Sequence, residues 1–340
     1  MMWRTGPRNL LTDVAGITVG NHTDETVKSG VTAILCDEPA AAGVQVLGGA
    51  PGTCETDALE PHNLVDGVDA ISLSGGSAFG IDAAAGVQAA LREMDRGFEI
   101  LGFRVPIVPG AILFDLPNGG DKNWGRFSPY RDFGFEAAMA ASQEFEIGSV
   151  GAGAGATTAA LKGGLGSAST VLENGITVGA LVAVNAVGSV TVGGTPHFWA
   201  APFEIGDEFG GLGLPHPMPD DASKVLTKLR ATARGNTTIA VIATDAKLDK
   251  AAAKRLAIAA HDGFARAIWP THTPVDGDLV FGLATGRNDT VLDMEGVIDL
   301  NAAATATMAR AIARGVFAAK KTNRDIFPVW EELKATSKRD

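Results

Sequence analysis

Runs of short strand-like segments, separated by a few long helical ones, set the fold class of this chain. Helical periodicity is clearest over residues 77–97, 249–268 and 299–319. Because the helices are clustered and do not alternate strictly with strands, the pattern predicts an α+β sandwich, which we expect to form one domain over residues 1–340. The strand-like segments are residues 17–19, 31–35, 44–47, 70–73, 107–114, 166–172, 176–184, 189–192, 237–243 and 279–284.

The composition is typical of a soluble globular protein and argues against nucleic-acid and membrane partners. The net charge is −11, and the sequence shows no basic cluster of the kind that phosphate binding requires. The uncharged run over residues 174–203 is interrupted by Gly179, Asn185 and Gly188, so we expect two core strands there and no transmembrane helix. The two cysteines, Cys36 and Cys54, and the lack of an apolar signal segment predict a cytoplasmic location without disulfides.

The clearest break in the pattern is a long segment between residues 202 and 235. Its first half, "PFEIGDEFGGLGLPHPMPDD", is rich in proline and glycine and predicts an exposed loop. Loops of this length in a compact fold usually have a function. This one leads to Asn236 and Thr237, directly before an apolar strand. The pair is either an ordinary turn and strand start, or a bond that the protein cuts itself, which would make Thr237 a new N-terminal nucleophile.

Several familiar motifs are incomplete. In "LSGGSAFG" a nucleophile elbow would require glycine where Phe79 stands, so Ser77 is interpreted as a helix N-cap. "GAGAGATT" has neither dinucleotide-binding nor P-loop spacing. The histidines form no metal-binding motif, His261 is interpreted as a surface or half-buried helix residue, and "HTPVDGD" as a polar turn. The sequence therefore predicts no metal and no cofactor, and the Thr237 hypothesis gains support.

Four segments together carry a resemblance to a known family. They are "AGAGATTAALKGG", "ALVAVNAVG", "RGNTTIAVIATD" and "PVDGDLVF", in this order and at compatible spacing. They resemble the P1 (DmpA-like) family of self-processing N-terminal-nucleophile hydrolases, which includes D-aminopeptidases, β-aminopeptidases and endo-type 6-aminohexanoate (nylon) oligomer hydrolases. The resemblance implies a four-layer αββα sandwich, like that of the ornithine acetyltransferases. It also implies cleavage into a large subunit (1–236) and a small subunit (237–340), and tetramers of the cleaved units.

The same resemblance assigns roles to individual residues. Thr237 matches the nucleophile and Asn236 the residue before the cut, while Lys162 and Asn185 match the family's active-site lysine and asparagine. Asp276 and Asp278 match the acidic pair near the new amine. A departure is Phe114, which stands where the nylon hydrolases carry tyrosine, so one phenol donor would be missing from the substrate pocket.

The chemistry of a threonine nucleophile agrees with these roles. A hydroxyl needs a base, and the α-amine of a terminal Thr237 would supply one, because such amines titrate near ~7.7–8.0. We expect Lys162 to hold the hydroxyl and lower the pKa of this amine, Asn185 and a backbone N–H to bind the oxyanion, and Asp276 or Asp278 to orient the ammonium. An ordinary structural role stays open for Lys162, Asn185 and the two aspartates.

The sequence thus predicts an amidohydrolase or aminopeptidase that cleaves amide bonds of small peptides or linear amide oligomers. Two alternatives stay open. One is acyl transfer, as in the ornithine acetyltransferases, which would pass the acyl group from Thr237 to an amine instead of water. The other is an uncut, non-catalytic binding scaffold, an alternative that Phe114 keeps open.

Overall fold

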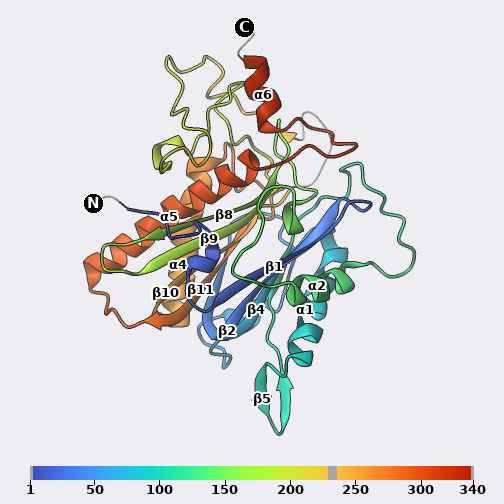
Figure 1. Cartoon of the computed structure of the whole chain (residues 1–340), viewed down its shortest axis with the longest axis vertical. Coiled ribbons are helices and arrows are strands. Elements are labelled where there is room, and N and C mark those ends of the chain that lie inside the picture. The colour runs from blue at the N-terminus through green and yellow to red at the C-terminus, as the bar shows by residue number, and fades with distance from the viewer. Residues whose placement is uncertain (1–2, 229–235, 338–340) are drawn as a thin grey trace.

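The structure is a computed structural model that describes residues 3–228 and 236–337. Its described strands form a nine-stranded sheet in the order β3-β7-β4-β2-β11-β10-β9-β8, with β1 paired to β2, and a separate hairpin of β5 and β6 that projects from the body (Figure 1). The strands are β1 (Ile17–Asp24), β2 (Ser29–Val46), β3 (Thr53–Cys54), β4 (Val68–Ser74), β5 (Phe98–Ile100), β6 (Phe103–Val105), β7 (Gly110–Ile112), β8 (Gly164–Val171), β9 (Thr177–Val184), β10 (Ile239–Ala246) and β11 (Leu279–Asn288).

The long strand β2 joins the two halves of this sheet. Its first half pairs with β1 and β4, and its second half, residues 41–46, pairs with β11. Next to β11 lies β10, which is parallel to β11 and antiparallel to β9. The sheet is therefore mixed, and the start of β10, two residues after Thr237, lies beside the start of β11.

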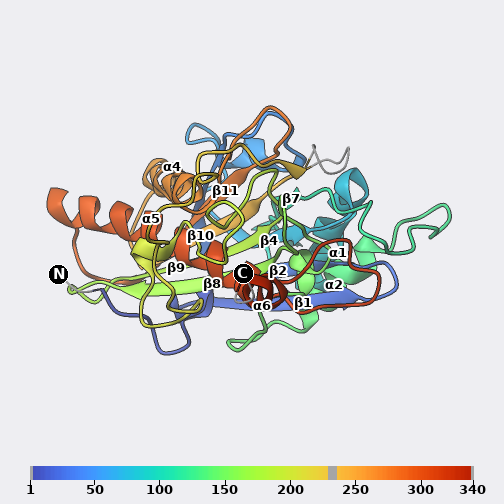
Figure 2. The same cartoon turned by 90° about the horizontal axis from the view of Figure 1, so that it is seen from above.

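The described helices are α1 (Asp82–Glu93), α2 (Tyr130–Met139), α4 (Lys250–Ala267), α5 (Met294–Phe317) and α6 (Trp330–Ser337). Four of the helices lie in two pairs at opposite sides of the sheet, α4 with α5 and α1 with α2, while α6 stands apart near the C-terminus (Figures 1 and 2). One apolar cluster joins α4 and α5 to β8–β11, and another joins α1 and α2 to β2 and β4. A third cluster is formed by side chains of both halves of the sheet, including Ile34, Leu181 and Phe281. The fold is mixed α+β, as the sequence predicts.

Several elements differ from the prediction. Residues 31–35 and 44–47 belong mostly to the single strand β2, and the predicted strand over 107–114 is reduced to β7, because Pro109 has no N–H for a ladder. Residues 189–192 make only isolated bridges, Ser189 to Trp269 and Thr191 to Phe198. Ser77 is not the N-cap of α1: it follows Gly76 in a left-handed turn, with φ of 54°, and starts a short 3-10 helix.

Helix α2 was not predicted, because its sequence "YRDFGFEAAM" has weak helical periodicity and contains a glycine. That glycine has a packing role. A Cβ at Gly134 would lie 2.1 Å from the carbonyl oxygen of Ala83, and one at Gly86 would lie 1.9 Å from that of Arg131. Glycine at both positions therefore lets α1 and α2 pack closely. No described helix is long and apolar enough to cross a membrane.

Candidate active site

Thr237 and the peptide bond before it lie buried just ahead of β10. The hydroxyl of Thr237 donates to the carbonyl oxygen of Asn236 at 2.5 Å. The amide nitrogen of Thr237 donates to the carbonyl oxygen of Asn185 at 3.0 Å. Both residues are nearly inaccessible, with 2% of Asn236 and 3% of Thr237 exposed. The hydroxyl is therefore held against the carbonyl group that it would attack in a self-cleavage reaction.

Gly277 contacts the same carbonyl group. Its amide nitrogen donates to the Asn236 carbonyl oxygen at 3.2 Å, and Asn236 pairs with Asp276 as an isolated parallel bridge. A Cβ at Gly277 would lie 2.7 Å from the Thr237 hydroxyl oxygen and 2.6 Å from the carbonyl oxygen of Ala50. Only glycine can approach Thr237 this closely without displacing a neighbour. Gly277 was not identified as a site residue from the sequence. The signal that could have found it is its position between Asp276 and Asp278.

Asn185 connects Thr237 to the surrounding loops. Its side-chain amide nitrogen donates to the carbonyl oxygen of Phe114 at 3.0 Å. Its side-chain oxygen accepts from the amide nitrogen of Thr157 at 3.0 Å and from the ammonium group of Lys228 at 3.1 Å. In this arrangement the side chain of Asn185 orders three loop segments, and its N–H group is directed at Phe114 and not at the carbonyl oxygen of Asn236.

Lys162 has a different environment from the one expected. Its ammonium group contacts Asp325 at 2.9 Å and the hydroxyl of Thr322 at 2.9 Å. Lys28 binds the same carboxylate at 2.7 Å. Burial lowers the pKa of Lys162, and the hydrogen bond that Lys162 donates to Asp325 acts in the opposite direction. In the continuous chain Lys162 thus belongs to a buried Lys–Asp–Lys group, and the Thr237 hydroxyl is held by Asn236.

The two aspartates hold the loop that carries Gly277. Asp278 accepts from the amide nitrogen of Thr238 at 2.9 Å, so its carboxylate binds the residue just after Thr237. Asp276 accepts from the amide nitrogen of Val187 at 3.2 Å and from the hydroxyl of Thr273 at 2.6 Å. Burial and the neighbouring charge of Asp278 raise the pKa of Asp276 to about 6. The nitrogen of Thr237 itself faces the carbonyl group of Asn185.

Lys228 is a second residue that the sequence did not reveal, because nothing in "LTKLRATARG" distinguishes it from a surface lysine. It is 1% exposed, and its amide nitrogen donates to the carbonyl oxygen of Val187 at 2.9 Å. With Phe114, Asp115 and Thr157, among others, it lines a cavity of only about 10 Å³. That volume is at the lower limit for one water molecule. Residues 229–235, which complete the connection to Asn236, lie outside the described residues.

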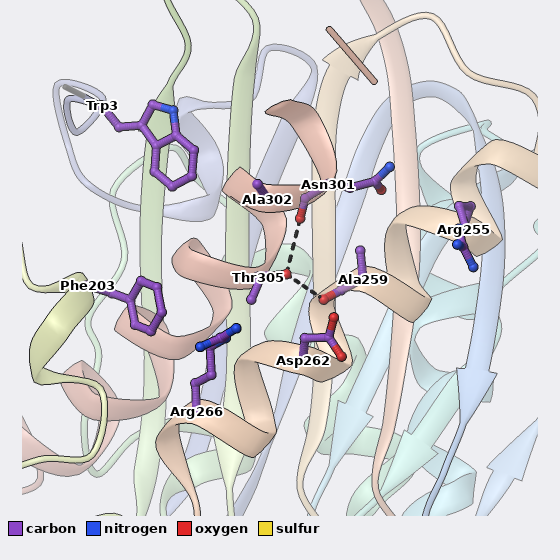
Figure 3. A pocket seen from close by; sticks show the side chains of 9 residues that line it. All are labelled: Trp3, Phe203, Arg255, Ala259, Asp262, Arg266, Asn301, Ala302 and Thr305. Atoms are coloured by element: carbon purple, nitrogen blue, oxygen red, sulfur yellow. Dashed lines mark hydrogen bonds between the residues drawn. The ribbon is translucent and has the colours of Figure 1, made fainter. Parts of the chain in front are cut away.

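The larger hollow drawn in Figure 3 lies elsewhere. It measures about 500 Å³ and lies on the outer side of α4 and α5. Arg266 stacks on the ring of Phe203 there, and the hydroxyl of Thr305 bonds the carbonyl oxygens of Ala259 and Asn301 (Figure 3). None of the residues around Thr237 lines it. In the part of the chain that the structure describes, no group of three or more His, Cys, Asp or Glu residues could hold a metal ion.

Comparison with known proteins defines the class of this molecule. Its fold matches that of the L-aminopeptidase D-Ala-esterase/amidase from Ochrobactrum anthropi, whose structure is described as a variant of the Ntn-hydrolase fold. The TM-score is 0.71 at 23% identity, covering 100% of this chain and 96% of the other. This similarity shows the fold, whereas the family match and the aminopeptidase relative given below show that the chain is a hydrolase.

The sequence assigns the family. Residues 9–325 match the model of peptidase family S58, and the chain belongs to this family. It is 44% identical to an uncharacterized aminopeptidase from Mycobacterium tuberculosis (strain ATCC 25618 / H37Rv), covering 94% of this chain and 98% of the relative. It is also 29% identical to a 6-aminohexanoate-oligomer endohydrolase from Kocuria sp. (strain KY2), covering 90% of this chain and 84% of the relative. The predicted relationship to the DmpA-like aminopeptidases and nylon oligomer hydrolases is confirmed.

Proposed function

We propose that this hydrolase cuts its own chain between Asn236 and Thr237 and then hydrolyses amide bonds with Thr237 as the N-terminal nucleophile. The observation that carries the proposal is the contact at the scissile bond. The Thr237 hydroxyl lies 2.5 Å from the Asn236 carbonyl oxygen, which also accepts the N–H of Gly277. A nucleophile and an oxyanion donor thus meet at one carbonyl group, as acyl transfer requires.

Self-cleavage would begin with attack of the Thr237 hydroxyl oxygen on the Asn236 carbonyl carbon. The C–O bond forms and the C–N bond breaks, while the proton of the hydroxyl ends on the nitrogen of Thr237, which becomes an amine. Negative charge that develops on the Asn236 oxygen meets the N–H of Gly277. Water then hydrolyses the ester, which leaves a carboxylate on Asn236 and a free hydroxyl on Thr237.

The new amine would activate the same hydroxyl for external substrates. An α-amine titrates near ~7.7–8.0, so an appreciable fraction is unprotonated at neutral pH. General base catalysis of this kind typically contributes about 10²- to 10⁴-fold in rate. The Asn185 carbonyl oxygen, 3.0 Å from the nitrogen of Thr237, is positioned to accept a hydrogen bond from the new amine. Before cleavage this nitrogen is an amide and cannot act as a base, so the precursor is inactive on external amides.

The substrate class that we propose is small peptides with a free amino terminus, with linear amide oligomers as the second candidate. The relative at 44% identity is named an aminopeptidase, whereas the 6-aminohexanoate-oligomer endohydrolase is 29% identical. Phe114 also differs from the tyrosine expected in the nylon oligomer hydrolases. We therefore expect aminoacyl amides to be cleaved faster than 6-aminohexanoate oligomers.

We further propose that the cleaved fragments, 1–236 and 237–340, stay together as one αββα domain and assemble into a tetramer. The three apolar clusters support four layers, since one lies between the halves of the sheet and one lies beneath each pair of helices. Strand β10 of the smaller fragment is paired with β9 of the larger one along its length, which would hold the fragments together.

Two substitutions test the assignment of the nucleophile. Thr237→Ala is expected to abolish both self-cleavage and hydrolysis of an aminoacyl p-nitroanilide. Thr238→Val is the matched comparison, because the Thr238 hydroxyl has no hydrogen-bond partner within residues 3–228 and 236–337. That variant should still be cut before residue 237. Cleavage and activity in Thr237→Ala would show that another nucleophile operates.

A further inference from the structure

A chain of hydrogen bonds runs from the neighbourhood of Thr237 to helix α4. Asp278, which binds the amide nitrogen of Thr238, also contacts the Nδ1 atom of His272 at 3.0 Å. The Nε2 atom of His272 lies 3.3 Å from Nδ1 of His261, and Nε2 of His261 lies 2.9 Å from the carbonyl oxygen of Gln45. Asp278 is 2% and His272 18% exposed in their side chains, so the chain is largely shielded from water.

The donor and the acceptor of each hydrogen bond can be assigned by starting from the carbonyl oxygen of Gln45, where the chain ends. A carbonyl oxygen can only accept, so Nε2 of His261 carries a proton. Burial lowers the pKa of His261 to about 4, so its ring is neutral at neutral pH and its Nδ1 atom is an acceptor. The Nε2 atom of His272 must therefore donate to it. One further proton then lies between Nδ1 of His272 and the carboxyl group of Asp278.

The other contacts of Asp278 decide where that proton resides. The carboxyl group accepts hydrogen bonds from the hydroxyl of Thr271 at 3.1 Å, the amide nitrogen of His272 at 3.1 Å and the amide nitrogen of Thr238 at 2.9 Å. Three donors directed at one carboxyl group favour its ionised form. The proton accordingly belongs on His272, which becomes an imidazolium that faces a carboxylate.

We propose that His272 is a positioning residue for the reaction at Thr237, and that it acts as a cation that keeps Asp278 ionised. The carboxylate binds Thr238 on one side of the nucleophile, and the adjacent Gly277 binds Asn236 on the other. His272 would thus fix both neighbours of Thr237 without touching the reacting atoms. Its backbone is in the left-handed region, with φ of 55°, a conformation that the surrounding contacts must hold.

The charged groups around His272 make its positioning role sensitive to pH. The titratable groups in contact with the chain are His261 from α4 and the pair Asp276 and Asp278 from the loop before β11. Loss of the imidazolium leaves the two neighbouring carboxylates without a cation, so the pair takes up a proton at higher pH. A protonated Asp278 no longer holds Thr238 as firmly, and the reaction slows.

This inference rests on the proposed function for its kinetic consequences but not for its first test. In ¹⁵N–¹H spectra of the Thr237→Ala chain at pH 7, both ring nitrogens of His272 should carry protons, with the signal assigned by its loss in His272→Asn. A neutral ring with one N–H would overturn the proposal. The result does not depend on whether the protein cuts itself, so the two hypotheses can fail separately.

The kinetic test uses three variants and the rate of self-cleavage between pH 4.5 and 8, a window of roughly two units around the ordinary pKa of histidine. His272→Ala should slow cleavage and move the acid limb of the profile upward by about one pH unit. His272→Asn keeps a hydrogen-bond donor for Asp278 but carries no charge. At pH 8 it should therefore cut itself faster than His272→Ala, while the acid limb of its pH profile stays shifted upward. The exposed His62→Asn serves as the control and should match the parent. An unshifted limb in both His272 variants would overturn the cationic role.

Discussion

The amide nitrogen of Gly277 donates to the carbonyl oxygen of Asn236 at 3.2 Å, across the start of two parallel strands. This contact places a hydrogen-bond donor on the oxygen that would become negative if Thr237 attacked its neighbour. It also explains why a glycine stands between two aspartates, because a side chain there would collide with Thr237. Gly277 therefore replaces Asn185 as the first candidate for the oxyanion donor in self-cleavage.

Gly277→Ala is expected to slow self-cleavage strongly. The added Cβ would push the backbone away from Thr237 and Ala50, and one oxyanion donor is worth about 2.7–4 kcal/mol, or roughly 10²- to 10³-fold in rate. The measurement is the rate of appearance of the two fragments after refolding. Gly194→Ala is the control, since a Cβ there would meet only a side-chain oxygen of Asp221 at 3.7 Å. Equal rates in the two variants would exclude Gly277 from the site.

Lys228→Met is expected to reduce self-cleavage because it removes a charged donor from the Asn185 side chain. Hydrogen bonds to charged groups contribute roughly 1.5–3 kcal/mol, so the rate should fall by about tenfold to a hundredfold if that energy is lost at the transition state. Lys224→Met, an exposed position in the same segment, should leave the rate unchanged. If Lys228→Met is cut as fast as the parent, the contact between Lys228 and Asn185 has only a structural role.

The sequence predicted the fold class and the family but not the details of the site. Buried strands and long helices are marked by periodicity, and the segments around Thr237 carry a recognisable order of small and polar residues. The partners of Lys162 and Asn185 could not be predicted in this way. They depend on Asp325 and Phe114, which are 163 and 71 residues away, and only the folded chain brings such groups together. The hydrogen-bonded histidines, 11 residues apart, were missed for the same reason.

Asp325→Asn is expected to destabilise the protein by about 3–5 kcal/mol, because it leaves the ammonium groups of Lys28 and Lys162 buried without a counter-charge. Burial raises the pKa of Asp325, but hydrogen bonds from Lys28, Thr322 and Lys162 outweigh this effect and hold it at about 2. The stabilising contribution is thus present above the ordinary value of 3.8 and is lost only as the pH falls through about 2. Urea unfolding at pH 7 measures the loss.

The control for that measurement is Asp289→Asn. Asp289 also pairs with a lysine, Lys247, but its side chain is 91% exposed and such pairs contribute little. The midpoint of unfolding should therefore stay close to that of the parent. If both variants lose the same stability, the buried position of Asp325 has no special importance.

His261 should make the protein less stable in acid. The folded ring titrates near pH 4, whereas the unfolded one titrates near its ordinary 6.5, so the unfolded chain binds the extra proton first as the pH falls. The contribution of His261 to the free energy of unfolding is complete above pH 6.5 and declines towards pH 4. Because a shift of one pKa unit corresponds to 1.36 kcal/mol, the total loss is about 3 kcal/mol. Denaturant titrations at several pH values measure this slope.

The matched variant is His261→Gln, which keeps an N–H donor for the carbonyl oxygen of Gln45 but does not titrate. Asp276 contributes the opposite slope, since its raised pKa makes stability fall as the pH rises from 3.8 towards 6. The difference between parent and variant isolates the histidine. A difference that stays constant between pH 4 and 7, a window set by the reference values of carboxylates and histidine, would contradict the prediction.

The most direct test of self-cleavage is the intact mass of the purified protein under denaturing conditions. If Asn236–Thr237 is the scissile bond, the chain of 340 residues separates into pieces of 236 and 340 − 236 = 104 residues. The smaller piece begins Thr-Thr-Ile-Ala. A single intact chain after prolonged incubation at neutral pH would contradict the central claim that Thr237 becomes an N-terminal nucleophile.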